Sequence, residues 1–149
     1  MISIEQIKQL RNKTGVSITE CKKALEEAKG DTEKAKKILR KKGQDFARKR
    51  LNRETKEGII DSYIHPGMKV GVLIELDCES DFVARSEDFH KLSHELCLQI
   101  AALPPEKEDQ LLGQEWIKDK TRTIKDLIDE YITRFGENIT IKGFTRYEL

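Results

Sequence analysis

The sequence predicts an α+β protein, in which a three-helix module precedes a small three-stranded antiparallel sheet packed with helices. Apolar residues recur every three or four positions through residues 1–43, which is typical of short amphipathic helices. After Gly58 the period changes to two, which is typical of half-buried strands. The later elements follow in the order hairpin, helix, helix, strand, and this order favours helices on one face of the sheet.

Residues 1–43 are predicted to form three short helices. Their expected start and stop signals are two capping-box spacings, a third N-cap and a terminal glycine: Ser3 with Gln6, Ser17 with Glu20, Asp31, and Gly43. The apolar positions at helical spacing are Ile4, Ile7, Leu10, Cys21, Ala24, Leu25, Ala28, Ala35, Ile38 and Leu39. A bundle of this size buries little apolar surface, so we expect it to be marginally stable alone or to be stabilised by packing against another part of the protein.

Residues 44–56 are predicted to be a charged, partly helical linker, because they hold few apolar positions. The net charge of +1 hides an asymmetry around this linker. Residues 1–56 hold 17 Lys and Arg against 8 Asp and Glu, whereas residues 57–149 hold 11 against 19. We therefore expect two separate units, and the basic one raises the hypothesis of nucleic-acid binding.

Residues 57–149 are predicted to form the α+β core domain, of the kind that dimerises. Its first strand, Ile59 to His65, is expected to turn at Pro66-Gly67 and to pair with a second strand, whose alternating apolar residues are Val70, Val72, Ile74, Leu76 and Cys78. A helix from Ser86 to Ala102 should end at two prolines, and residues 104–120 are expected to be irregular. A helix from Thr123 to Phe135, stopped at Gly136, and a strand from Asn138 to Tyr147 complete the domain.

The bulk composition excludes several classes of protein. No stretch approaches the roughly 18 apolar residues of a membrane span, and the first residues look like a helix start rather than a signal peptide. The three cysteines are an odd number, widely spaced, without a CxxC pair. A reducing intracellular compartment therefore fits better than a disulfide framework.

The sequence does not indicate an enzyme, a metal site or a cofactor. His90 and His94 have the spacing of two zinc ligands on one helix face, but Lys91 stands where a zincin has its glutamate, and no third ligand is evident. Cys97 and His94 could be imagined as a nucleophilic pair, but no third group orients them. Neither a GxxxxGK[ST] nor a GxGxxG loop is present to cradle phosphates.

Residues 36–53 carry nine positive charges with only Asp45 against them, enough to neutralise several phosphates. Only Phe46 is available among them for base stacking, and no nucleic-acid module is recognisable. A solvated helix face and linker explains the stretch better than a nucleic-acid site does. An RNA- or ribosome-binding accessory protein that uses residues 36–53 is the alternative function.

The segment Ser80-Asp81-Phe82-Val83 lies where a strand turns into a helix. Local chemistry alone explains it as a helix start, with Ser80 as the cap and Asp81 favoured at the N-terminus. On that interpretation, Phe82 and Val83 face the core.

Two stretches of sequence together resemble translation elongation factor Ts, in a short form with a single core subdomain. The first is Ile7-Lys8-Gln9-Leu10-Arg11-Asn12-Lys13-Thr14-Gly15 with Glu20-Cys21-Lys22-Lys23-Ala24-Leu25 and Gly30-Asp31, which is similar to the family's UBA-like (ubiquitin-associated-like) three-helix module. The second is Leu76-Asp77-Cys78-Glu79-Ser80-Asp81-Phe82-Val83-Ala84-Arg85, similar to the signature at the end of a core strand. A weaker third match is Phe135-Gly136-Glu137-Asn138-Ile139.

The resemblance implies a guanine-nucleotide exchange factor for the GTPase elongation factor Tu, in its GDP-bound and nucleotide-free states. It implies that Ser80, Asp81, Phe82 and Val83 form a tip that dislodges the Mg²⁺ of the partner, and that Arg11, Ile18, Thr19 and Lys22 dock the module. It implies no catalytic site, cofactor, membrane or direct nucleic-acid contact, and a cytoplasm of the bacterial type or an organelle as the compartment.

The chain also departs from the family pattern. Ser80 replaces the usual threonine, and Ser17-Ile18-Thr19 replaces Gly-Met-Met. The acidic residues 106–120 stand where longer members carry a large insertion, so contacts made by that insertion cannot be carried over. One hypothesis is that a homodimer replaces the missing half, because a three-stranded sheet needs its exposed face covered.

Overall fold

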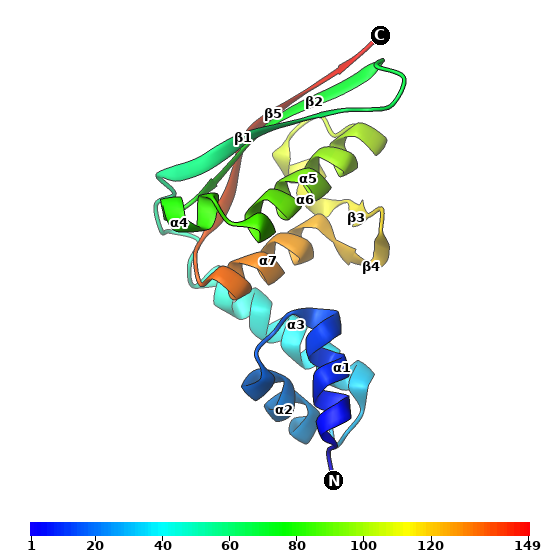
Figure 1. Cartoon of the computed structure of the whole chain (residues 1–149), viewed down its shortest axis with the longest axis vertical. Helices are drawn as coiled ribbons and strands as arrows, with labels where there is room; N and C mark the ends of the chain where they lie inside the picture. The colour runs from blue at the N-terminus through cyan, green and yellow to red at the C-terminus, as the bar shows by residue number, and fades with distance from the viewer.

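The computed structural model describes residues 1–149 and has a helical module at one end and an α+β core at the other (Figure 1). The elements follow in the order α1 (Ile4–Thr14), α2 (Ile18–Glu27), α3 (Thr32–Arg48), β1 (Glu57–Ile64), β2 (Val70–Cys78), α4 (Asp81–Ala84), α5 (Glu87–Ala102), α6 (Glu108–Gly113), β3 (Glu115–Trp116), β4 (Asp119–Thr123), α7 (Ile124–Phe135) and β5 (Ile139–Glu148). This arrangement confirms the predicted α+β fold class. None of the helices is both long and apolar enough to cross a membrane.

The N-terminal module begins its helices where the sequence predicts. The Ser3 side chain accepts from the Gln6 amide in a full capping box, Ser17 caps α2 and Asp31 caps α3. The module's own core is one cluster of seven buried residues: Leu10, Cys21, Ala24, Leu25, Ala28, Ala35 and Leu39. So small a cluster contributes little stability, as expected from the length of the module.

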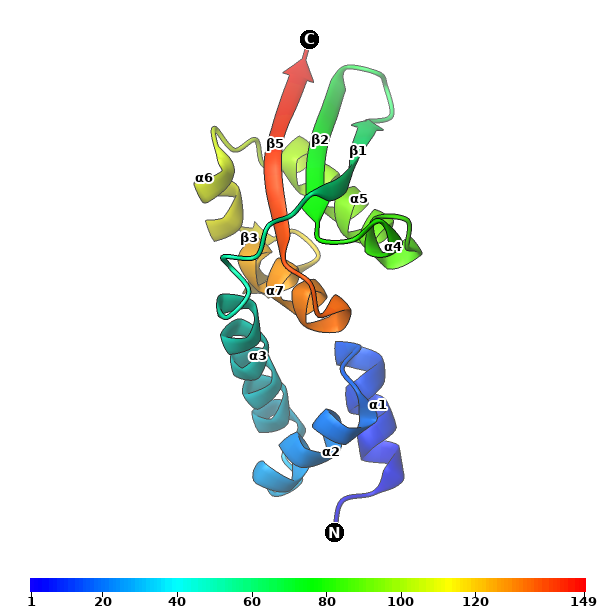
Figure 2. The same ribbon diagram turned by 90° about the vertical axis from the view of Figure 1, so that its left-hand side faces the viewer.

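The predicted helix stop at Gly43 is wrong, because α3 continues to Arg48 and takes in part of the predicted linker. Gly43 is buried where α3 crosses α7, and a Cβ atom there would lie 3.3 Å from the Thr133 hydroxyl. The glycine therefore lets two helices approach closely instead of ending one. As a result α3 extends from the module to the core as a continuous helix (Figure 2).

The main sheet has the strand order β1-β2-β5, and both of its pairings are antiparallel. Val72, Ile74 and Leu76 of β2 point to the helices and are almost completely buried. They belong to a 20-residue core cluster that also takes in side chains of α5 and α7. In Figure 2 the other face of the sheet is turned to the viewer, with α5 behind it.

The prediction that residues 104–120 are irregular is also wrong, since they contain α6 and the β3 strand, and β4 begins at Asp119. Leu111 of α6 is fully buried in the main core. The buried amide of Gln99 on α5 donates to the carbonyl of Glu115 at 3.0 Å and accepts from the amide of Ile117 at 2.9 Å. Leu111, with the partly buried Leu112 and Trp116, packs this acidic stretch on the main core, and the Gln99 amide bonds it to α5.

Candidate functional site

The segment after β2 forms a tip at one side of the core. Cys78 ends β2, Ser80 caps the four-residue helix α4, and Ser86 caps α5 directly after it. The Ser80 hydroxyl accepts from the amide of Val83 at 3.3 Å. In Figure 1, α4 lies at the left, beside the start of α5 and close to the end of β2.

Within the tip, Val83 points inward and Phe82 points out. Val83 is 5% exposed and packs into the main core, whereas 87% of Phe82 is accessible to solvent. The local prediction that both side chains face the core is therefore wrong for Phe82. The exposed ring of Phe82 is therefore available for a contact with another molecule.

Asp81 lies beside Phe82 and forms an ion pair with Arg85, with 2.9 Å between Oδ2 and Nε. The side chains are 56% and 81% exposed, so water screens the pair, and it contributes little to stability. Both groups are therefore free to exchange partners when another charged surface approaches.

The loop between α7 and β5 supports the tip. The amides of Glu79 and Ser80 donate to Glu137 Oε1 at 3.1 and 2.9 Å, and the Ser80 hydroxyl donates to Glu137 Oε2 at 2.6 Å. In the opposite direction, the amide of Asn138 donates to Glu79 Oε2 at 2.6 Å. Sequence reasoning assigned no role to Glu137 or Asn138, and the only signal for them was the weaker third motif.

The four predicted docking residues all lie on the surface of the module. Arg11 is on the last turn of α1, and Ile18, Thr19 and Lys22 are on α2. All four are exposed, including 54% of the apolar Ile18. In Figure 2, α4 lies above α1 on the same side of the molecule.

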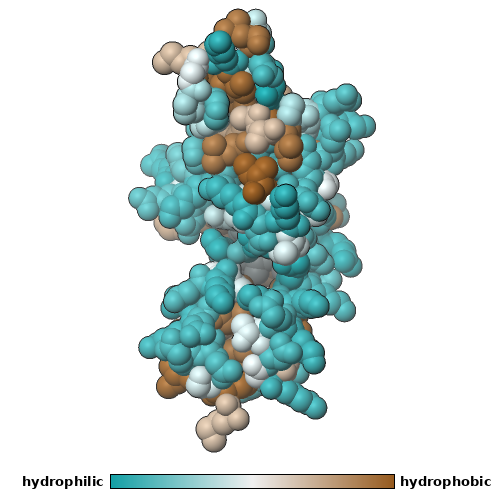
Figure 3. All heavy atoms as spheres, turned by 90° about the vertical axis from the view of Figure 1, so that its right-hand side faces the viewer, coloured by the Kyte–Doolittle hydropathy of each residue, from teal (hydrophilic) through white to brown (hydrophobic).

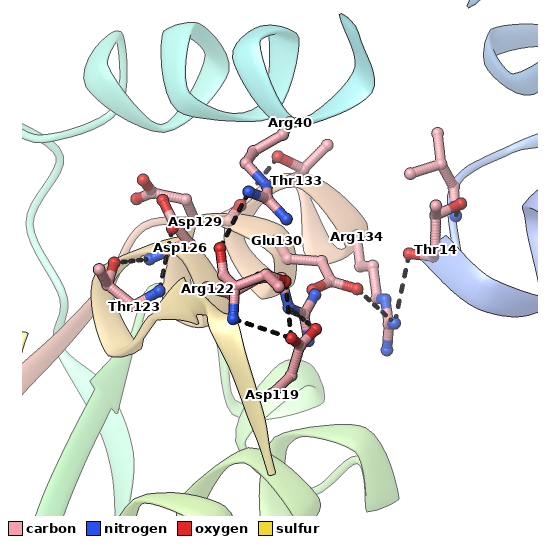
Figure 4. Close-up of polar contacts among 12 residues, drawn as sticks. Thr14, Arg40, Asp119, Arg122, Thr123, Asp126, Asp129, Glu130, Thr133 and Arg134 are labelled. Carbon is pink, nitrogen blue, oxygen red and sulfur yellow. Dashed lines mark hydrogen bonds and ion pairs between the residues drawn. The ribbon is translucent and has the colours of Figure 1, made fainter. Parts of the chain in front are cut away.

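Several polar contacts join the module to the core (Figure 4), in addition to Ala47 at the end of α3, which is buried in the main core. The hydrogen bonds run from Arg40 to the carbonyl of Thr121 at 3.2 Å, from Gln44 to Asp126 at 3.1 Å, from Thr133 to the carbonyl of Gly43 at 3.5 Å, and from Arg134 to the carbonyl of Thr14 at 3.4 Å. A cleft of about 500 Å³ lies here, and only two of its 17 lining residues are hydrophobic. Figure 3 shows the corresponding hydrophilic waist between the two parts.

The three cysteines are buried, whereas His90 and His94 are exposed on α5. His94 stacks edge-on against Tyr63, with 5.8 Å between ring centroids. Burial raises the pKa of Cys97 to about 12, so its sulfur is a thiol near neutral pH rather than a thiolate nucleophile. Burial, together with the nearby charge of Glu137, raises the pKa of Cys78 to about 11.

Ser80 uses its hydroxyl both as a donor and as an acceptor, which leads to a first prediction. Ser80→Ala is expected to lower the free energy of unfolding by about 1–2 kcal/mol, because a helix cap and a bond to a carboxylate are lost. Ser80→Thr keeps the hydroxyl and should stay within about 0.5 kcal/mol of the parent. Urea unfolding measures both variants, and equal midpoints for Ala and Thr would contradict the dual role.

Comparison with known proteins gives a consistent family assignment. A model of the family Elongation factor TS matches residues 79–149. Elongation factor Ts of Thermotoga maritima is 42% identical over 191 residues, which cover 99% of this chain and 96% of the relative. The proteins of the same name from Thermoanaerobacter sp. and Coprothermobacter proteolyticus are both 39% identical over 193 residues, covering 99% of this chain and 95% and 98% of the relatives.

The aligned lengths exceed the 149 residues of this chain, so these relatives carry internal residues that it lacks. The alignment nevertheless covers 99% of this chain, so it spans both the module and the core. The chain therefore belongs to the elongation factor Ts family of translation elongation factors.

Proposed function

We propose that this chain is a guanine-nucleotide exchange factor for the GTPase elongation factor Tu, and that it acts on the GDP-bound and nucleotide-free states. The observation that carries the proposal is the exposure of Phe82 on a turn whose next residue, Val83, is anchored in the core. Asp81 and Phe82 then reach the Mg²⁺ and phosphate site of the partner, while Ser80 and Val83 hold the turn in shape. The chain supplies binding and needs no cofactor of its own.

The mechanism is the displacement of Mg²⁺ rather than recognition of the guanine base. Mg²⁺ offsets the charge of the phosphate oxygens, so moving it weakens the hold on the nucleotide. Burying one phenylalanine contributes roughly 1.5–3 kcal/mol, whereas loosening the nucleotide a thousandfold requires about 4 kcal/mol of differential binding. Docking through Arg11, Ile18, Thr19 and Lys22 supplies the difference in this proposal.

The two effects are linked: if the factor weakens nucleotide binding to elongation factor Tu by a given ratio, bound nucleotide weakens the binding of the factor to elongation factor Tu by the same ratio. The factor therefore leaves when GTP rebinds. The expected compartment is the one in which translation elongation takes place, a bacterial-type cytoplasm or an organelle.

The test is the release of fluorescently labelled GDP from elongation factor Tu, measured by stopped flow with excess unlabelled nucleotide. Added factor is expected to speed the release in a saturable way. A release rate that does not change at any factor concentration would exclude the exchange function.

The alternative, RNA binding through residues 36–53, receives less support from the side chains. Lys36 pairs with Glu33 at 2.7 Å, and Lys42 lies within 4.0 Å of two glutamates, so part of the positive charge is already balanced. Arg50 covers the ring of Phe46 at 3.3 Å from its centroid, which removes that ring as a stacking platform. Steeply salt-dependent RNA binding, lost on neutralising Arg48, Lys49 and Arg50, would support the alternative instead.

A homodimer stays a hypothesis, and the outer face of the sheet favours it. Ile60, Ile64, Leu73 and Tyr147 are 52–75% exposed on this face. Ile64 and Tyr147 both lie opposite Gly71 in the strand register, whereas Ile60 lies opposite Glu75. We expect sedimentation equilibrium to give twice the 17.2 kDa chain mass at micromolar concentration, and a monomeric mass would contradict the hypothesis.

A further inference from the structure

We infer that Glu137 is a positioning residue that holds the tip in the orientation from which Phe82 engages the partner. The inference rests on the proposed exchange function and goes beyond it, because Glu137 lies in the loop between α7 and β5 and outside the tip itself. The inference gives a role to the Glu137 carboxylate, which is 57 positions from Ser80 in the sequence and bonds directly to it.

The tip requires support from outside, because α4 is too short to hold its own shape. A helix of four residues makes about one turn, and an isolated single turn is unstable in water. Val83 and Ala84 anchor one side of the turn in the core. The other side, where the chain leaves β2, is held by Glu137.

Glu137 uses both of its carboxylate oxygens on this segment. It accepts two backbone amides and one hydroxyl within 2.6–3.1 Å, all from the two residues that precede α4. Hydrogen bonds to a charged acceptor are roughly twice as strong as neutral ones. The bond to the Ser80 hydroxyl also orients the oxygen that caps α4, so Glu137 acts on the first turn through Ser80.

The same loop connects the tip to the segment that follows α3. The carbonyl of Gly136 accepts from Arg50 Nε at 3.2 Å and from Arg53 Nη1 at 3.4 Å. The Asn138 side chain donates to the carbonyl of Arg53 at 3.0 Å. Residues 136–138 therefore bond both to the tip and to the segment after α3, which fixes the tip relative to the element that carries the module.

Rigid placement matters for the proposed wedge because an ordered binding group loses less entropy when it docks. Phe82 itself packs against nothing that would fix it, since 87% of it is exposed. Its direction is set by the backbone of α4, and that backbone is oriented by Val83 on one side and Glu137 on the other.

The test compares Glu137→Gln and Glu137→Ala with wild-type protein in the GDP-release assay at saturating factor. We expect the maximal release rate to fall about threefold for Gln and about tenfold for Ala, because bonds to a charged acceptor are weakened or lost. Glu54→Gln is the matched control, since Glu54 is exposed and pairs only with Lys56, and it should leave the rate unchanged. Amide hydrogen exchange at Ser80 should speed up in both Glu137 variants while the amide of Leu76 stays protected.

A double-mutant comparison separates positioning from general stability. In a Phe82→Ala background, Glu137→Gln should change the release rate by less than about twofold, because the group that it positions is gone. Equal losses in both backgrounds, or unchanged exchange of the Ser80 amide, would overturn the inference. A Glu137→Gln protein as fast as wild type would overturn it while leaving the exchange function standing, and wild-type protein that does not speed GDP release would overturn both.

Discussion

Phe82→Ala is expected to lower the maximal rate of GDP release from elongation factor Tu by about 10- to 100-fold at saturating factor. The size follows from the roughly 1.5–3 kcal/mol that burial of a phenylalanine contributes, with about 1.4 kcal/mol for each factor of ten. The fold should be unaffected, because the side chain is 87% exposed and surface substitutions usually stay within about 0.5 kcal/mol. Stopped-flow release and thermal unfolding together measure both parts of this prediction.

Leu103→Ala is a suitable control for this variant, since it removes another exposed apolar side chain, at the far end of α5. It should change neither the release rate nor the unfolding midpoint. Phe82→Leu retains part of the apolar surface and should give an intermediate rate. Release that is as fast with Phe82→Ala as with wild-type protein would exclude Phe82 as the wedge.

The sequence could predict the tip as a location but could not predict the direction of its side chains. Ser80 as a helix cap follows from local chemistry, and the structure confirms it. Phe82 and Val83 are neighbours on a single helical turn, so they project in different directions. Which of the two enters the core depends on how α4 sits on the sheet and α5, and no short-range pattern contains that information.

The other wrong or missing predictions about the fold have the same cause. The sequence predicts a helix stop at Gly43 because glycine commonly ends helices, but in the structure Gly43 lets α3 approach Thr133 on α7. The support that Glu137 gives to Ser80 spans 57 positions in the sequence. Capping, strand alternation and turns are local and could be predicted, whereas these contacts arise only when distant segments pack.

The second large effect is expected from Leu25→Ala in the core of the module. Leu25 is fully buried in a cluster of only seven residues, and replacing a buried leucine by alanine destabilises by about 2–5 kcal/mol. This loss of stability is large for a module with so small a core, so the module should unfold locally. The 20-residue main core should stay folded. Circular dichroism should therefore show a partial loss of helix well below the main unfolding transition.

For exchange, Leu25→Ala should raise the factor concentration that gives half-maximal GDP release by at least about tenfold, because the docking surface of Ile18 and Lys22 loses its support. The maximal rate should fall much less, since the tip is intact, and this pattern is the reverse of the one expected for Phe82→Ala. Leu51→Ala, the same substitution at a leucine that is 64% exposed, should change neither quantity. If Leu25→Ala unfolds the module and the half-maximal concentration stays the same, the module does not dock the factor, and the tip alone must account for binding.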